Sequence, residues 1–353
     1  MYSEGVSSSK DGIETIIFLL QFIFSKLPGL HVKLLSNDME NDIIPYFCNM
    51  ISDRLRAEPY LFYAYISLLT SIAKTSQQSA DSIYTFIDKS PSEFVSWPIL
   101  IGSLSEAEKL IHTDNAQRGL LDIDLIGFVG ILDLITAVME NATSCPNIRG
   151  NMQANTVELF IKLLHEPIHV MLKSKILSVL VCYAKEPIYA KMILQQLEYG
   201  AIISNNPATG IRFEFLNIET PSCLFALTSS FLELLIQLVK TCTADVFISS
   251  PCFPVVFDFV VNVVLKDYHV RNSLNHRAGE KFFIASLSIQ FLTLLLSIFS
   301  RVYQERFKLS PENSIILERL SFIIHEVLGN QEFVRNVCTF PSNISLQLFS
   351  KLF

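Results

Sequence analysis

The sequence has little charge, and the charge that it has is scattered. Of its 353 residues, 17% are Asp, Glu, Lys or Arg, while 50% are hydrophobic. No window gathers Lys and Arg into a stripe that could neutralise phosphates, and the net charge is −7, so we expect no direct nucleic-acid partner. There is no block of like charge and no Gly/Ser-rich or Pro-rich connector. The composition therefore favours one continuous array of repeats over two or three linked domains.

Motifs that carry catalysis or bind cofactors are also missing. No Gly-rich phosphate loop follows a strand, and no Gly-x-Ser-x-Gly elbow or pair of carboxylates is visible. The seven cysteines form no Cys-x-x-Cys pair, which is typical of reduced core residues in a cytosolic or nuclear protein. They are Cys48, Cys145, Cys182, Cys223, Cys242, Cys252 and Cys338. We expect no enzyme, no cofactor, no small-molecule substrate, and no catalytic, cofactor-binding or metal-binding residues.

One segment superficially resembles a metal site. In HEPIH, His165 and His169 stand four residues apart with Glu166 between them, as two zinc ligands on one helical face would. Pro167 starts a new helix there and interrupts that face, and no third ligand lies nearby in the sequence. We interpret this segment as a surface turn. The most basic stretch, HVRNSLNHRAGEKF at 269–282, also contains Glu280 and follows Asp267, and we interpret it as a solvated turn between helices.

The apolar residues recur at helical spacing from Ile13 onward, and breaks separate them into about fourteen helices. Because the breaks have no fixed period, we predict an all-α fold, an irregular α-solenoid of stacked antiparallel helix pairs, HEAT- or armadillo-like. Residues 1–12 are expected to be a disordered tail and 13–353 a continuous solenoid segment, part of a longer solenoid. Within it, 198–222 is predicted to be a long loop, with a short hairpin at IRFEF. Prolines are expected to mark helix starts at Pro59, Pro167, Pro187, Pro254 and Pro311.

Residues 120–140 are predicted to form one buried helix. Its only exposed edge should carry the polar residues that share a face, which are Asp122, Asp133, Thr136 and Glu140. Gly127 and Gly130 would each cost about 1 kcal/mol relative to alanine in a helix interior. We therefore expect both glycines to admit a neighbouring helix closely.

The uncharged run at 282–300 is long enough for a membrane span. Polar residues nevertheless recur in steps of three and four, which places them on one helical stripe. They are Ser286, Gln290, Thr293, Ser297, Ser300 and Gln304. We predict a soluble solenoid helix that continues to about Gln304, with Leu294 deep in the stack. A multi-span membrane protein stays open as an alternative, because the mean hydropathy is +0.39.

The order of the segments at 58–304 resembles the N-terminal half of the large inner-ring scaffold nucleoporins of the nuclear pore complex. The similarity is clearest in ELFIKLLHEPIHVMLKSKILSVLVCYAKEPIYAKMILQQLE, followed by FLNIETPSCLFALTSSFLELLIQLV. The chain departs from the family in having Phe282 where members tend to carry tryptophan, and in being far shorter. The positions on which the resemblance depends are Pro187, Leu197 and Glu198, Asn217 to Glu219, Pro251, Arg277 and Ala278, and Glu280 and Lys281.

The resemblance implies a non-catalytic α-solenoid at the nuclear envelope. Its grooves would bind linker nucleoporins through short helical segments, with apolar anchors at helical spacing. No individual binding residue can be transferred from the family, because the matched positions have the character of core residues. The chief alternative is a soluble HEAT-type transport receptor or adaptor, because such proteins also have stacked helices and a net negative charge.

Overall fold

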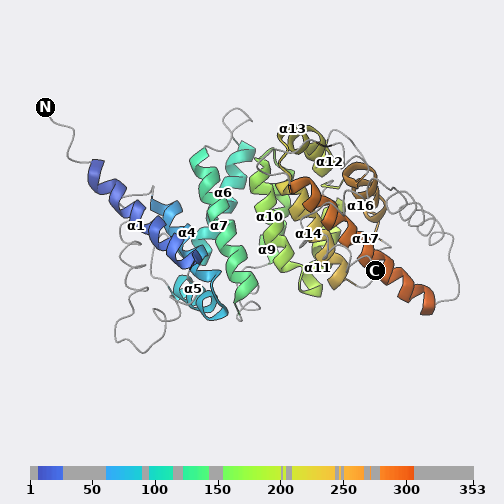
Figure 1. The fold of residues 1–353 in the computed structure, drawn as a ribbon, viewed down its shortest axis with the longest axis horizontal. Coiled ribbons are helices and arrows are strands. Elements are labelled where there is room, and N and C mark those ends of the chain that lie inside the picture. The colour runs from blue at the N-terminus through green and yellow to red at the C-terminus, as the bar shows by residue number, and fades with distance from the viewer. Residues whose placement is uncertain are drawn as a thin grey trace. The chain divides into compact units, whose positions relative to one another are not determined.

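A computed structural model describes residues 7–26, 61–89, 95–113, 122–142, 154–199, 202–203, 209–242, 246–247, 250–265, 271 and 279–305. In these ranges the chain is all-α, without a strand, and its helices pack in pairs as in a solenoid-like fold, so the predicted fold class is confirmed (Figure 1). The chain forms two compact units, Met1–Cys182 and Tyr183–Phe353. The continuity of the array from 13 to 353 stays a prediction.

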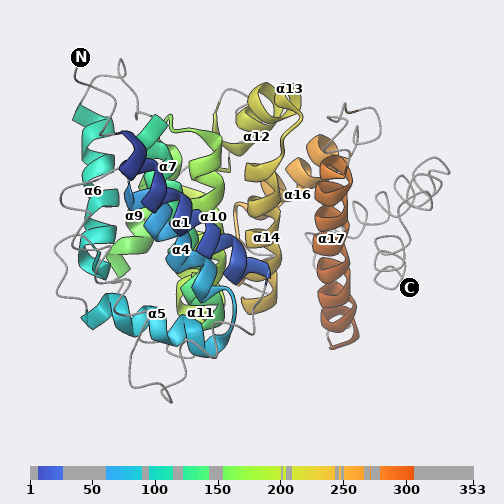
Figure 2. The same ribbon diagram turned by 60° about the vertical axis from the view of Figure 1, so that its left-hand side comes forward.

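The first unit is built around α4, a helix that is apolar on nearly every side. It contacts α1, α5 and α7, and α6 contacts α9 (Figure 2). Nine of the thirteen residues of α4 are buried, which suits a helix with neighbours on several faces. The helices of this unit are α1 (Ser7–Lys26), α4 (Leu61–Ala73), α5 (Gln77–Lys89), α6 (Trp97–Thr113), α7 (Asp122–Asn141), α9 (Ala154–His165) and α10 (Val170–Tyr183).

The helix α5 shows how local sequence sets a helix and its burial. Ser76 precedes it, and the Ser76 hydroxyl accepts a hydrogen bond from the Ser79 N–H at 3.1 Å, which satisfies one of the free amides of the first turn. Its buried apolar residues then follow at helical spacing, with one stripe facing the unit. They are Ala80, Ile83, Tyr84 and Ile87.

The predicted helix at 120–140 is α7, and most of its face assignment is confirmed. From Gly130 onward Asp133, Thr136 and Glu140 lie on the less buried edge. Asp133 there pairs with Lys175 of α10 at 2.7 Å. The polar edge is not the only exposed one, because Ile126 in the first half of the helix is 46% exposed. The side chain of Asp122 lies outside the described residues.

The two glycines of α7 differ in their surroundings. A Cβ added to Gly130 would lie 3.4 Å from side-chain atoms of Ile66 and Tyr63, so the prediction of a close helix neighbour is confirmed there. A Cβ on Gly127 would meet nothing within 4 Å among the residues that the structure describes, so the same prediction is wrong for that residue there. Close approach of α4 therefore requires a small residue at only one of the two positions.

The second unit contains short helices and two π-helical segments around α14 and α17. Aromatic rings join them: the centroid of Phe215 lies 5.8 Å from those of Phe225 and Phe259, and Phe231 lies 6.0 Å from Phe259. The elements are α11 (Pro187–Tyr199), α12 (Gly210–Glu214), η1 (Phe215–Glu219), α13 (Thr220–Ser222), α14 (Ala226–Thr241), α16 (Phe253–Asp258), η2 (Phe259–Leu265) and α17 (Glu280–Glu305).

Two predictions about irregular segments are wrong. Residues 210–222 are helical, so neither the long loop nor the hairpin at IRFEF is found there. The buried positions are Ile211, Phe215 and Glu219, so the buried stripe contains only two apolar residues and ends in a carboxyl.

The helix α1 begins at Ser7, inside the predicted disordered tail. This helix packs on α4, and it includes the polar residues that precede Ile13. Residues 1–6 lie outside the described ranges.

The prolines that were expected to start helices do so in part. Pro187 is the first residue of α11, and Pro254 is the second residue of α16. Pro167 lies in the turn before α10, which starts three residues later at Val170. Pro59 and Pro311 lie outside the described residues. A missing N–H is harmless in a first turn, which is why these positions accept proline.

The polar stripe of α17 is confirmed where the structure describes its side chains. Ser286, Gln290 and Thr293 are half-buried and Ser297 is exposed, while Ser300 and Gln304 lie outside the described side chains. Leu294 was expected to be deep in the stack but is half-buried, and its neighbour Leu295 is the fully buried residue. Among the described helices, none combines the length and the apolarity that a membrane crossing requires.

We expect Leu132→Asp to destabilise the first unit by several kcal/mol, because Leu132 is fully buried and an unpaired carboxylate there would lose its hydration. Ile126→Asp is the matched control on the same helix, and its effect should stay within about 1 kcal/mol because Ile126 is half exposed. Chemical denaturation of both variants measures the difference. Equal losses would show that the burial of α7 is assigned incorrectly.

In α17, Gln290→Glu should change the free energy of unfolding by about 0.5 kcal/mol or less, since Gln290 lies on the half-buried polar stripe. Leu295→Glu should cost several kcal/mol, because its carboxylate would be buried among apolar side chains. Thermal melts in detergent-free buffer test both. Comparable damage from the two substitutions would contradict the stripe.

Candidate functional site

The segment HEPIH does not bring its histidines onto one helical face. His165 ends α9, whereas His169 precedes α10 and its Nδ1 accepts the Met171 N–H at 3.2 Å. Burial lowers the pKa of His165, and nearby Lys173 lowers it further. Across the described ranges, no group of three or more His, Cys, Asp or Glu side chains could hold a metal ion. Residues 166–169 lie between α9 and α10, and His165, Pro167 and His169 are exposed, so the interpretation of HEPIH as a surface turn is confirmed.

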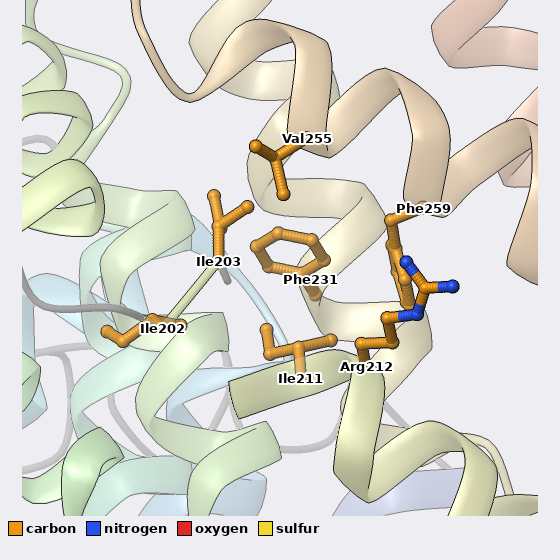
Figure 3. Close-up of a pocket in the computed structure, with 7 residues that line it drawn as sticks. All are labelled: Ile202, Ile203, Ile211, Arg212, Phe231, Val255 and Phe259. Atoms are coloured by element: carbon orange, nitrogen blue, oxygen red, sulfur yellow. The ribbon is translucent and has the colours of Figure 1, made fainter. Parts of the chain in front are cut away.

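One small recess in the second unit is lined mostly by apolar side chains. Figure 3 shows Phe231 at its centre, with Ile203 and Val255 on one side and Arg212 beside Phe259 on the other. Its volume of about 10 Å³ is close to the space that a single water molecule needs. Arg212 is held by an ion pair with Asp258 at 3.2 Å. This recess is too small to accept a substrate.

The most elaborate polar arrangement in the described residues lies at the N-terminus of α14. Glu219, the last residue of η1, is 1% exposed. Its Oε1 accepts the Leu227 N–H at 2.7 Å, and its Oε2 accepts the Thr228 N–H at 3.1 Å and a short hydrogen bond from the Thr228 hydroxyl. The first amides of a helix have no partner inside the helix. Glu219 therefore caps α14 from another helix.

A second glutamate side chain accepts a hydrogen bond at the same helix end. Oε2 of Glu280, the first residue of α17, accepts the N–H of Phe225 at 3.1 Å. Phe225 occupies the N-cap position of α14, and its side chain cannot accept a hydrogen bond. Two glutamates from two other helices thus provide the acceptors that the local sequence lacks.

Arg271 caps the C-terminal end of η2, where carbonyls rather than amides need partners. Its guanidinium donates short hydrogen bonds to the carbonyls of Val263 and Val264, and it lies over the ring of Phe215, 4.6 Å from the centroid. Lys281 in turn donates to the Arg271 carbonyl at 3.0 Å. Since Arg271 is buried, the interpretation of 269–282 as a solvated turn is wrong at this residue. The carbonyls at a helix end attract cations, which explains the placement.

These capping residues could have been found in part from sequence. Glu219, Glu280 and Lys281 are among the positions on which the family resemblance depends. The burial of Glu219 and the hydrogen bonds of all three residues supply a physical reason for these residue types. Arg271 lies among other charged residues in the sequence, and nothing in the spacing separates it from solvated neighbours.

Large apolar side chains are exposed on one face of α1 in the first unit. Phe22 is 60% exposed, while Ile17 and Phe24 of the same helix are buried. The helix is therefore apolar on the face that packs on α4 and also on part of its outer face. The exposed residues are Ile16, Phe18, Leu19 and Phe22. We call this set the α1 patch.

The second unit exposes apolar residues along α12 and η1. Phe213, Leu216 and Ile218 are exposed, although the buried stripe of the same helical segment includes Phe215. Exposed apolar groups at helical spacing are typical of surfaces that bind a partner. Neither surface brings together groups that could perform catalysis.

Glu219→Ala should destabilise the second unit by about 2 to 4 kcal/mol, because two buried amides lose their acceptor. Glu219→Gln keeps one acceptor oxygen and almost the same volume, so it should cost clearly less. Chemical denaturation at a fixed pH compares the two variants. If alanine and glutamine cost the same, the carboxyl is not the cap that the geometry indicates.

Comparison with known proteins gives one partial similarity. No family model matches the chain. The chain is 25% identical over 205 residues to the nuclear pore complex protein Nup205 of Homo sapiens, an alignment that covers 55% of this chain and 10% of the human protein. The chain thus spans about a tenth of the length of the curated protein that it matches. The similarity is to a nucleoporin, and it agrees with the resemblance found in the sequence.

Proposed function

We propose that this chain is a scaffold segment of the inner ring of the nuclear pore complex, located at the nuclear envelope, and that it is not an enzyme. It would bind linker nucleoporins through helical grooves and so support nucleocytoplasmic transport. The observation that carries the proposal is the similarity to human Nup205. The all-α fold of packed helix pairs supports it, because stacked helices offer grooves to a partner helix.

The α1 patch is the surface that we propose for a partner helix. A helix that docks on another helix uses apolar anchors three and four residues apart. In the α1 patch, Ile16 and Leu19 lie three residues apart, and Phe18 and Phe22 lie four apart. Side chains of this size can dominate the binding energy of an interface when a partner covers them. The partner would be a short amphipathic helix of another nucleoporin.

Proximity labelling with the tagged chain tests the proposed location. Inner-ring nucleoporins should be the most enriched proteins, and the tagged chain should remain at the nuclear rim. A shuttling protein that labels cargoes and a small GTPase in a nucleotide-dependent manner would instead support the transport-receptor alternative and overturn the scaffold proposal.

The double variant Ile16→Asp with Leu19→Asp tests the proposed surface. Both residues are more than half exposed, so the melting temperature should change little, while the labelling of linker nucleoporins should fall at least tenfold. Ile188→Asp is the control, since Ile188 is 81% exposed on α11, outside the α1 patch. Unchanged labelling by a folded double variant would exclude the α1 patch but would leave the proposed location intact.

A further inference from the structure

Glu219 is an ionisable group at a position where its charge affects the packing of α14. Its carboxyl is buried, and it receives hydrogen bonds from Leu227 and Thr228 in the first turn of α14. Glu280 approaches the same helix end, through the N–H of Phe225. The geometry is thus a cluster of two carboxyls, one hydroxyl and three backbone amides around a single helix terminus.

Three cationic side chains on the elements packed around Glu219 have other partners. Arg212 of α12 pairs with Asp258 of α16. Arg271 donates to the carbonyls of η2, and Lys281 donates to the carbonyl of Arg271. Glu214 of α12 acts on Glu219 as a like charge. The first turn of α14, from Ala226 to Ser229, contains no charged residue, and α13 contains none.

The cap can be made by either protonation state of Glu219. As a carboxylate it accepts from the two amides and from the Thr228 hydroxyl. As a neutral acid it can donate its proton to the Thr228 hydroxyl oxygen, because a hydroxyl both donates and accepts. Oε1 then still accepts the Leu227 N–H at 2.7 Å and lies 3.4 Å from the Thr228 nitrogen. The neutral form keeps the helix end satisfied without a buried charge.

We propose that Glu219 is a proton-operated latch on α14. With its carboxyl neutral, the first turn of α14 stays closed on η1, and loss of the proton makes this turn open more often. The inference concerns the second unit and does not depend on the proposed function.

The midpoint expected for the latch lies in the range of cellular pH. Burial raises the pKa of Glu219 from 4.5 to about 7, although the hydrogen bonds from Thr228 and Leu227 lower it part of the way. A group whose pKa is higher in the closed state than in the open state stabilises the closed state fully below the open-state pKa. That stabilisation is lost as the pH rises from about 4.5 through about 7.

Hydrogen exchange measured by mass spectrometry on the full chain tests the latch. After correction for the intrinsic pH dependence of exchange, the opening constant of the peptide that contains Leu227 and Thr228 should rise about tenfold between about pH 6 and about pH 8. Glu219→Gln cannot ionise, so its opening constant should change less than about twofold over the same range. Glu280→Gln is the matched control at the same helix end, and it should keep the tenfold rise.

Thr228→Val provides an independent test if Glu219→Gln does not fold. This substitution removes the hydroxyl that donates to the carboxylate and accepts from the neutral acid, so the pKa of Glu219 should shift. The pH at which the opening constant levels off should shift with it. A parent chain whose opening constant changes less than twofold would overturn the proposal. So would a tenfold rise that persists in Glu219→Gln, or a Thr228→Val curve identical to that of the parent.

Discussion

The second unit depends on one requirement, which is that the first amides of α14 must have acceptors. The helix begins after Phe225, whose side chain provides none. A buried helix end without partners would lose about 1 to 3 kcal/mol for each unsatisfied amide. Glu219 supplies its carboxyl from eight residues before Leu227, and Glu280 supplies its own from the start of α17. One helix terminus thereby fixes η1 and α17 against α14.

The same requirement explains why some of the few ionisable side chains of the protein lie at buried helix ends. Arg271 lies against the last carbonyls of η2 in the way that Glu219 lies against the first amides of α14. The cation also lies over Phe215, a residue of the aromatic cluster that joins η1, α14 and η2. In a chain with only 17% charged residues, these buried ionisable groups act as structural caps. Their presence in the core needs no catalytic explanation.

Sequence periodicity predicted the long helices well, because each of them buries a stripe of apolar residues. In α7 and α17 the polar positions could be placed within a turn, as Asp133 and Gln290 show. Periodicity failed where a buried residue is polar and the exposed residues are apolar. Residues 210–222 bury the carboxyl of Glu219 and expose Phe213 and Leu216, so the apolar pattern there contradicts the true face. Two π-helical segments, which do not wind at 3.6 residues per turn, add to the mismatch.

The proposed binding surface on α1 illustrates a second limit of the apolar pattern. A residue that packs in the core and a residue that awaits a partner have the same chemistry, so sequence cannot distinguish Ile17 from Leu19 on α1. The structure distinguishes them, since Ile17 is buried against the unit and Leu19 is exposed. A scaffold protein needs no reactive group, and its specificity depends on which apolar side chains remain uncovered. The α1 patch is the set that we propose for this role, and Ile16 and Leu19 within it have the three-residue spacing of contacts that one helix makes with another.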